Sequence, residues 1–259
     1  MQGPQGCGKT TLCNELRRQL GVDGIHAEVL SLDDLYLDFD GLEDMRKRHP
    51  DNPLLSGRGQ PGTHDLGLIS ETLGAVLQIN TTRVPVHLPM FDKSANGGRG
   101  DRSGETTTIQ APVDVFVLEG WSFGFMPLTP DGLKERHGGS SAAYSSRHSL
   151  DALLQVNTNL STFAATTYAF PFATLVQIEP VDYDLVFRWR LEQEQAMKAA
   201  NGGRGMTDAE VEQFVARYMP GYELWKDGMW ETGRGLPWEG SGLRLYYGPE
   251  REVTAVVRM

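Results

Sequence analysis

The sequence predicts an α/β fold in which helices cover both faces of a mostly parallel β-sheet. Short apolar runs at 25–30, 84–88, 113–118 and 172–178 alternate with stretches of helical periodicity. The run at 113–118 is almost continuously apolar, as a parallel strand buried on both faces should be. Strands and helices that alternate in this way favour one three-layer domain spanning residues 1–259.

The predicted helices carry apolar residues at helical spacing. Leu12, Leu16 and Leu20 recur every fourth residue, as expected of a helix that packs one face onto a sheet. Thr207 and Glu210 match a capping box, which indicates where another helix begins. The other expected elements are helices from 65 to 77, from 150 to 160 behind Ser149 and from 182 to 199, strands at 243–247 and 252–258, and a disordered, low-complexity loop at 138–149.

Charge and composition exclude some classes of function. The 24 Lys plus Arg against 34 Asp plus Glu give a formal net charge of −10, which argues against binding nucleic acid or an anionic membrane through bulk charge. No stretch resembles a membrane-spanning helix, because polar residues and Pro171 break the most apolar segment, 163–178. Two cysteines, Cys7 and Cys13, are too few for a disulfide framework, which favours the reducing cytoplasm.

The strongest motif lies at the start of the chain, where Gly3-Pro4-Gln5-Gly6-Cys7-Gly8-Lys9-Thr10 fits the phosphate-binding loop, or P-loop. Glycines let successive backbone N–H groups face phosphates, and the N-terminus of the following helix adds its positive dipole end. In that geometry Lys9 bridges the β- and γ-phosphates of ATP and Thr10 holds Mg²⁺. The alternative interpretation is a glycine-rich turn that caps an ordinary helix.

The motif also makes the fold class specific. A P-loop leaves the end of a buried strand, yet only Met1 and Gln2 precede Gly3. We therefore expect a three-layer P-loop NTPase fold whose first strand is missing from this sequence, together with the N-terminal segment that would contain it.

Two carboxylates follow predicted strands, at the edge where an α/β sheet places its chemistry. Asp33 is a candidate general base, or orienting group, for an acceptor hydroxyl. Glu119 ends the apolar run as an acidic group near Mg²⁺ would. The alternatives are that Asp33 or Asp34 caps a turn and that Glu119 pairs with a cation in the core.

Several blocks together resemble D-glycerate 3-kinase and its fungal ATP-binding relatives, within the P-loop kinases that include phosphoribulokinase, uridine kinase and pantothenate kinase. The P-loop extended to Thr11 and the block from Ser31 to Tyr36 are shared by that wider group. The narrower resemblance is carried by Gly62-Thr-His-Asp-Leu66, Phe91-Asp-Lys-Ser94, Gly98-Arg-Gly-Asp-Arg102, Glu119-Gly-Trp121, Trp189-Arg190, Gly205-Met-Thr-Asp208 and Arg217-Tyr-Met-Pro220.

The resemblance implies ATP- and Mg²⁺-dependent phosphorylation of the 3-hydroxyl of D-glycerate, a small anionic hydroxy acid, to 3-phosphoglycerate. On this resemblance, Asp33 matches the catalytic aspartate, with Tyr36 in the same block, and Glu119 belongs to the Mg²⁺ shell. The implied acceptor-site residues are Arg58, Lys93, Arg99 and Arg102, whose cationic groups would grip the carboxylate, and His64, which could instead cap the helix near Asp65. Arg188 and Arg190 fall in an expected mobile lid at about 182–220.

Two other functions stay open from the sequence. One is a uridine, pantothenate or phosphoribulose kinase, although the arginine-rich loop at 98–102 favours a small anionic acceptor over a nucleoside. The other is an ATP-binding regulatory protein without turnover. The presence of Asp33 and Glu119 beside Lys9 argues against it, because binding alone requires no base.

Overall fold

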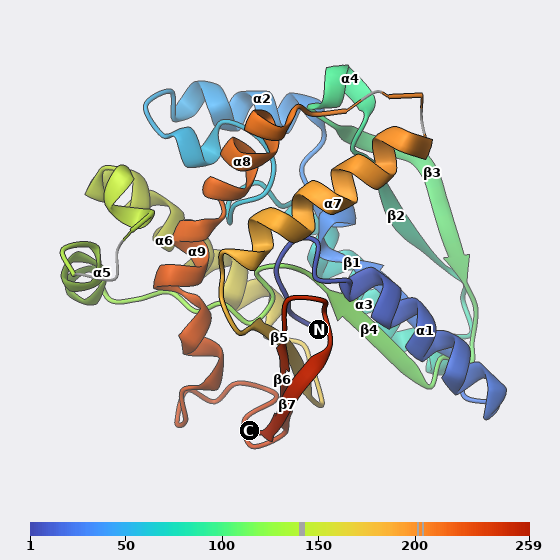
Figure 1. Ribbon diagram of the computed structural model, residues 1–259. Coiled ribbons are helices and arrows are strands. Elements are labelled where there is room, and N and C mark those ends of the chain that lie inside the picture. The colour runs from blue at the N-terminus through green and yellow to red at the C-terminus, as the bar shows by residue number, and fades with distance from the viewer. Residues whose placement is uncertain (140–142, 201, 204) are drawn as a thin grey trace.

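The computed structural model describes residues 1–139, 143–200, 202–203 and 205–259 (Figure 1). Its central strands fall into two groups that the start of the chain connects. β1 (Ala27–Ser31) pairs with β4 (Val115–Glu119) in parallel, and β5 (Leu175–Pro180) pairs in parallel with β6 (Gly242–Tyr247). Gln2 forms parallel bridges to both Gly120 and Gln177 and so links the two groups. The expected α/β arrangement around parallel strands is confirmed.

Two strand pairs are antiparallel. β7 (Val253–Arg258) closes the C-terminal edge as the partner of β6. β2 (Val86–Asp92) pairs with β3 (Asp101–Ile109) in a separate two-stranded sheet. The sequence predicts a strand near β2 but none at β3, because β3 is polar and mostly exposed and has no apolar alternation. Its strand conformation is instead supported by hydrogen bonding to β2.

A helix is present at each position where the sequence predicts one, and two of the expected caps are formed. The side chain of Ser149 accepts from the amide of Ala152, and both bonds of the Thr207–Glu210 capping box are present. The α-helices are α1 (Lys9–Val22), α2 (Phe39–Arg48), α3 (Leu66–Thr82), α4 (Ala95–Gly98), α5 (Pro130–His137), α6 (Leu150–Thr167), α7 (Leu185–Ala200), α8 (Asp208–Ala216) and α9 (Met219–Leu224). Of these, α1, α3, α6, α7 and α8 are the predicted helices, whereas α2, α4, α5 and α9 were not predicted. Short 3₁₀ helices cover Leu32–Leu35, Pro53–Leu55, Ser145–Arg147 and Lys226–Trp230.

The packing of α1 differs in detail from the prediction. Cys13 is the buried residue of this helix, whereas Leu16, expected on the sheet-facing side, is 38% exposed. Cys13 lies beside Met1, with its Sγ 3.6 Å from the Met1 Sδ. The helix therefore rests on the sheet through a narrower stripe than its leucine spacing indicates.

The segment expected to be a disordered loop at 138–149 is largely folded. Ser145 is fully buried, and the amides of Tyr144 and Ser145 donate to the two carboxylate oxygens of Glu223, at 2.8 and 2.7 Å. Disorder is therefore wrong for residues 143–149, because a carboxylate from α9, distant in sequence, satisfies their backbone; residues 140–142 lie outside the described part of the chain.

Within the described residues, no helix is both long enough and apolar enough to cross a bilayer. The expected helical region at about 182–220 is present as α7, α8 and the start of α9. Figure 1 shows α7 crossing the molecule on the near side, above the strands and beside the start of the chain.

Candidate active site

The P-loop connects the Gln2 bridge to α1 and is shaped by its glycines. Gly6 and Gly8 adopt left-handed backbone angles, with φ of 73° and 93°. A Cβ on Gly6 would lie 2.5 Å from the carbonyl carbon of Trp189, so glycine is required there for space as well as for φ. Lys9 folds back over the loop and donates from Nζ to the carbonyl oxygen of Pro4 at 3.1 Å.

The two residues expected to hold a metal ion are in contact. The Thr10 hydroxyl donates to Glu119 Oε1 at 3.0 Å, and Glu119 is almost fully buried at the end of β4. Among the described residues Glu119 forms no ion pair, which removes the alternative that it neutralises a core cation. Hydroxyl and carboxylate oxygens are ligands that Mg²⁺ accepts, so the pair fits this ion.

No group of three or more His, Cys, Asp or Glu side chains within the described ranges is arranged to hold a metal by itself. Phosphate oxygens and waters are the usual additional ligands of Mg²⁺ in kinases.

Asp33 lies in the 3₁₀ helix that follows β1. Ser31 caps that helix by accepting from the Asp33 amide, which leaves the Asp33 carboxylate for other contacts. Its Oδ1 accepts from the Tyr36 hydroxyl at 2.9 Å, and its Oδ2 pairs with Lys93 Nζ at 2.5 Å. Burial raises the pKa of Asp33, but the Lys93 and Tyr36 contacts outweigh it and lower that pKa to about 2. Asp33 is thus a carboxylate at any physiological pH, and a weak base while Lys93 is bound.

The predicted arginines Arg58, Arg99 and Arg102 each already have a protein partner. Arg102 pairs with Asp65 at 2.7 Å, and Arg99 pairs with Glu43 and stacks on a phenylalanine. Arg58 donates to the carbonyl oxygen of Gly98 at 2.9 Å, and so joins the two loops that carry these residues.

His64 is buried against the same cluster. Its ring packs on Tyr36, with centroids 4.5 Å apart, and neither ring nitrogen has a hydrogen-bond partner among the described residues. Burial lowers the pKa of His64 to about 4, against a smaller opposing effect of the Asp33 charge. Asp65, not His64, caps α3, since its Oδ1 accepts from the Leu68 amide. His64 is therefore a neutral imidazole with unused hydrogen-bonding capacity.

The two lid arginines point to protein partners. Arg188 donates to the carbonyl of Pro249 and pairs with Glu250, both in the turn between β6 and β7. Arg190 pairs with the buried Glu194 at 2.6 Å. In this structure neither guanidinium is directed at the P-loop side chains.

Three contacts of the site have no signal in the sequence. The Trp121 indole donates to the carbonyl of Gly59 and holds the loop before His64. The Tyr222 hydroxyl donates to Gln5 in the P-loop, from 217 residues away. Arg251 reaches the P-loop from the C-terminal turn. Only the fold brings such distant residues together, and no local motif indicates them.

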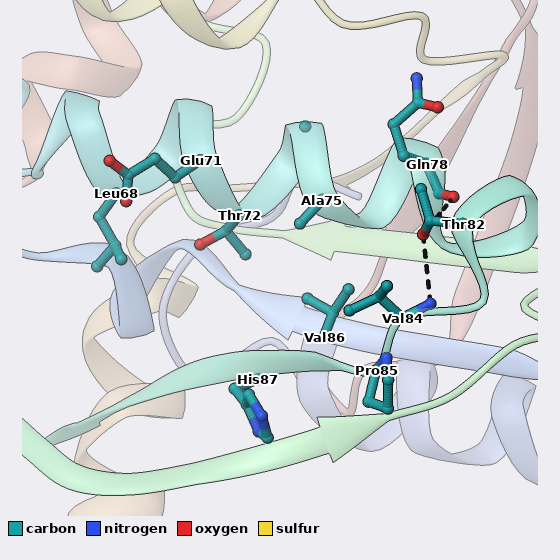
Figure 2. A pocket seen from close by; sticks show the side chains of 11 residues that line it. Leu68, Glu71, Thr72, Ala75, Gln78, Thr82, Val84, Pro85, Val86 and His87 are labelled. Carbon is teal, nitrogen blue, oxygen red and sulfur yellow. Dashed lines mark hydrogen bonds between the residues drawn. The ribbon is translucent and has the colours of Figure 1, made fainter.

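A cavity of about 480 Å³ lies between α3 and the start of β2 (Figure 2). Residues from Leu68 to Thr82 and from Val84 to His87 line it, and none of the predicted site residues is among them. Neither the P-loop nor Asp33 lines this cavity, so it is separate from the candidate active site.

Comparisons with known proteins agree with this geometry. The chain is 36% identical over 233 residues to the chloroplastic D-glycerate 3-kinase of Arabidopsis thaliana, covering 89% of this chain and 48% of that protein, so it spans about half the length of that relative. It is 36% identical over 227 residues to an uncharacterized kinase of Schizosaccharomyces pombe, covering 86% and 78% of the two chains. The solved structure of D-glycerate 3-kinase from Cryptococcus neoformans var. grubii has a TM-score of 0.92 and 39% identity, covering 100% and 88%. No protein-family model matches the chain.

Proposed function

We propose that this chain, which belongs to the family of D-glycerate 3-kinase and its fungal kinase relatives, phosphorylates the 3-hydroxyl of D-glycerate with ATP. The observation that carries the proposal is the contact between Asp33 and Lys93 beside the P-loop. This contact places two groups side by side: the Asp33 carboxylate, which can accept the proton of a hydroxyl, and the Lys93 ammonium, which can bind the carboxylate of an acid.

The nucleotide half of the proposed mechanism uses the P-loop. Its backbone N–H groups and the N-terminus of α1 would face the phosphates, and Lys9 would leave the Pro4 carbonyl to neutralise the transferred group. Thr10 and Glu119 would hold Mg²⁺, which supplies positive charge against the phosphate oxygens when it is bound.

The acceptor half depends on an exchange of partners at Lys93. The carboxylate of a bound hydroxy acid would compete with Asp33 for the Lys93 ammonium. Loss of that cation raises the pKa of Asp33, because the effect of burial is then opposed only by the weaker contributions of Tyr36 and Lys9. Asp33 would then accept the proton of the 3-hydroxyl. The oxygen of that hydroxyl bonds to the γ-phosphorus of ATP, while the bond between the γ-phosphorus and the bridging oxygen breaks and ADP leaves. An acceptor without an acidic group would leave Asp33 paired and weakly basic.

We also propose a cytoplasmic location and a small-molecule partner. Cys7 and Cys13 are both free thiols. This state fits a reducing compartment. The net charge of −10 does not oppose a small anion, since Lys93 and the surrounding arginines supply cations locally.

An ADP-release assay with a panel of acceptors tests the proposal. The panel is D-glycerate, L-glycerate, uridine, pantothenate and ribulose 5-phosphate, each against an acceptor-free control. We expect D-glycerate to give the largest stimulation over the basal ATP hydrolysis. ATP binding without stimulation by any acceptor would instead favour a regulatory protein, and stimulation by uridine alone would favour a nucleoside kinase.

A further inference from the structure

Three segments far apart in the sequence meet at the P-loop residue Gly6. They are the P-loop itself, α7 at Trp189, and the turn at 248–252 between β6 and β7, which Figure 1 shows beside α7 and the start of the chain. The link is Arg251, whose Nε donates to the carbonyl oxygen of Gly6 at 2.8 Å. Its guanidinium lies over the Trp189 ring, 5.4 Å from the centroid, and pairs with Glu192 at 2.8 Å.

The backbone of Arg251 is held in a conformation that arginine seldom adopts. Its φ is 63°, in the left-handed region that is strained for residues other than glycine. Two backbone bonds fix the turn, from Arg251 N to Gly248 O and from Gly248 N to Glu252 O. The turn thereby keeps the arginine side chain directed at the P-loop.

The bond to Gly6 has a consequence for the next amide of the loop. In a planar trans peptide the carbonyl oxygen and the following N–H point in opposite directions. Since Arg251 binds the Gly6 carbonyl on one side, the Cys7 N–H points to the other, where it makes a long contact of 3.4 Å with Pro4 O. Lys9 Nζ donates to the same Pro4 oxygen. Two donors of the P-loop therefore converge on one carbonyl that a phosphate oxygen could replace.

We propose that Arg251 is a positioning residue of the nucleotide site, which orients the Gly6–Cys7 peptide so that the Cys7 N–H faces a bound phosphate. Arg251 touches no reacting atom in this scheme and acts through the P-loop backbone. The inference rests on the proposed function only in requiring that ATP binds the P-loop, and it is independent of the acceptor. The competing explanation is structural: Arg251 only ties the turn to α7, through its ion pair with Glu192, its place over the Trp189 ring and its 3.4 Å contact with the Trp189 carbonyl oxygen.

Four variants separate these explanations by the dissociation constant of ATP, measured by calorimetry. Arg251→Met removes the bond to Gly6, and we expect it to weaken ATP binding about tenfold or more, as for the loss of a charged hydrogen bond. Arg251→Lys, which retains the charge, should recover part of that affinity. Glu192→Gln removes the ion pair to α7 but leaves the Gly6 bond and the contacts with Trp189, so it should change affinity less than about twofold. Arg258→Met is the matched control, an exposed arginine of the same hairpin with no side-chain partner among the described residues.

Each outcome decides the matter. If Arg251→Met and Arg258→Met bind ATP equally, or if Glu192→Gln loses as much affinity as Arg251→Met, the positioning role is overturned. If Arg251→Met does not fold, the same comparison is made between Arg251→Lys and Glu192→Gln. If the unmodified chain binds ATP but does not phosphorylate D-glycerate, only the proposed function is overturned. If it binds no ATP, both the proposed function and the positioning role of Arg251 are overturned.

Discussion

The two halves of the candidate active site are held together by different forces. In the nucleotide half, backbone groups of the P-loop are fixed by close packing against Trp189 and by the Arg251 bond. In the acceptor half, charged side chains bind one another, as in the Lys93–Asp33 and Arg102–Asp65 pairs. In the proposed mechanism ATP would therefore meet a backbone surface that is largely formed, with Lys9 and the Cys7 amide exchanging the Pro4 carbonyl for phosphate, while an acid would have to break an ion pair to bind.

The largest effect should come from the acceptor half. Asp33→Asn removes the proposed proton acceptor, so we expect turnover to fall about 10²–10⁴-fold while ATP affinity stays within about threefold. Steady-state kinetics with D-glycerate and a separate ATP titration measure the two quantities. Asp34→Asn is the neighbouring control, because its amide oxygen can still accept from the Phe91 amide. A loss of ATP affinity as large as the loss of turnover would contradict the division into halves.

A glycine pair tests how tightly the nucleotide half is packed. Gly6→Ala adds a Cβ within 2.5–2.8 Å of the Trp189–Arg190 backbone as well as left-handed strain, and we expect it to lower the free energy of unfolding by about 3 kcal/mol. Gly8→Ala carries the strain alone, since nothing lies within 4 Å of its Cβ, and should cost about 1 kcal/mol. Urea unfolding measures both. Equal losses would show that the P-loop is not held against α7.

Lys93 provides a test of the ion-pair exchange. Lys93→Met should raise the KM for D-glycerate by about 10- to 100-fold and leave the KM for ATP unchanged. It should also move the acid limb of the rate profile to higher pH, because the ammonium that holds the pKa of Asp33 near 2 is gone and burial raises it. Lys134→Met, at an exposed position of α5, is the control. An unchanged acid limb would mean that Lys93 does not control Asp33.

The smallest effect concerns His64, whose lowered pKa makes the stability of the fold depend on pH. Between about pH 6.5 and 4 the unfolded chain binds a proton at this residue that the folded chain does not, so stability contributed here falls as the pH falls through that window. His64→Phe should flatten this part of the curve. Unfolding free energies at pH 7 and pH 5 measure the slope, and an identical slope in the two proteins would exclude a buried neutral histidine.

Features that depend on nearby residues could be predicted from the sequence, and features that depend on distant partners could not. The P-loop, the strand ends at Asp33 and Glu119, and the Thr207 cap depend on neighbours within a few residues, so local spacing indicates them. The polar strand β3 and the folded segment around Ser145 depend on partners distant in sequence, so no local pattern indicates them.

The acceptor half was predictable only in part. The residue types at Arg99 and Arg102 suit an anion, but their pairing with Glu43 and Asp65 is a property of the fold. The same holds for Arg188, whose partners in the β6–β7 turn lie about 60 residues further along the chain. Local sequence specifies which charges are present, and tertiary packing decides which of them meet.

The most direct test of the central claim is the identity of the product. The chain is incubated with ATP and D-glycerate, and phosphorus NMR distinguishes phosphate on the 3-oxygen from phosphate on the 2-oxygen. The account predicts 3-phosphoglycerate, formed in equal amount to ADP and abolished in Asp33→Asn. Release of inorganic phosphate without a phosphorylated acid, or phosphorylation of the 2-oxygen, would contradict it.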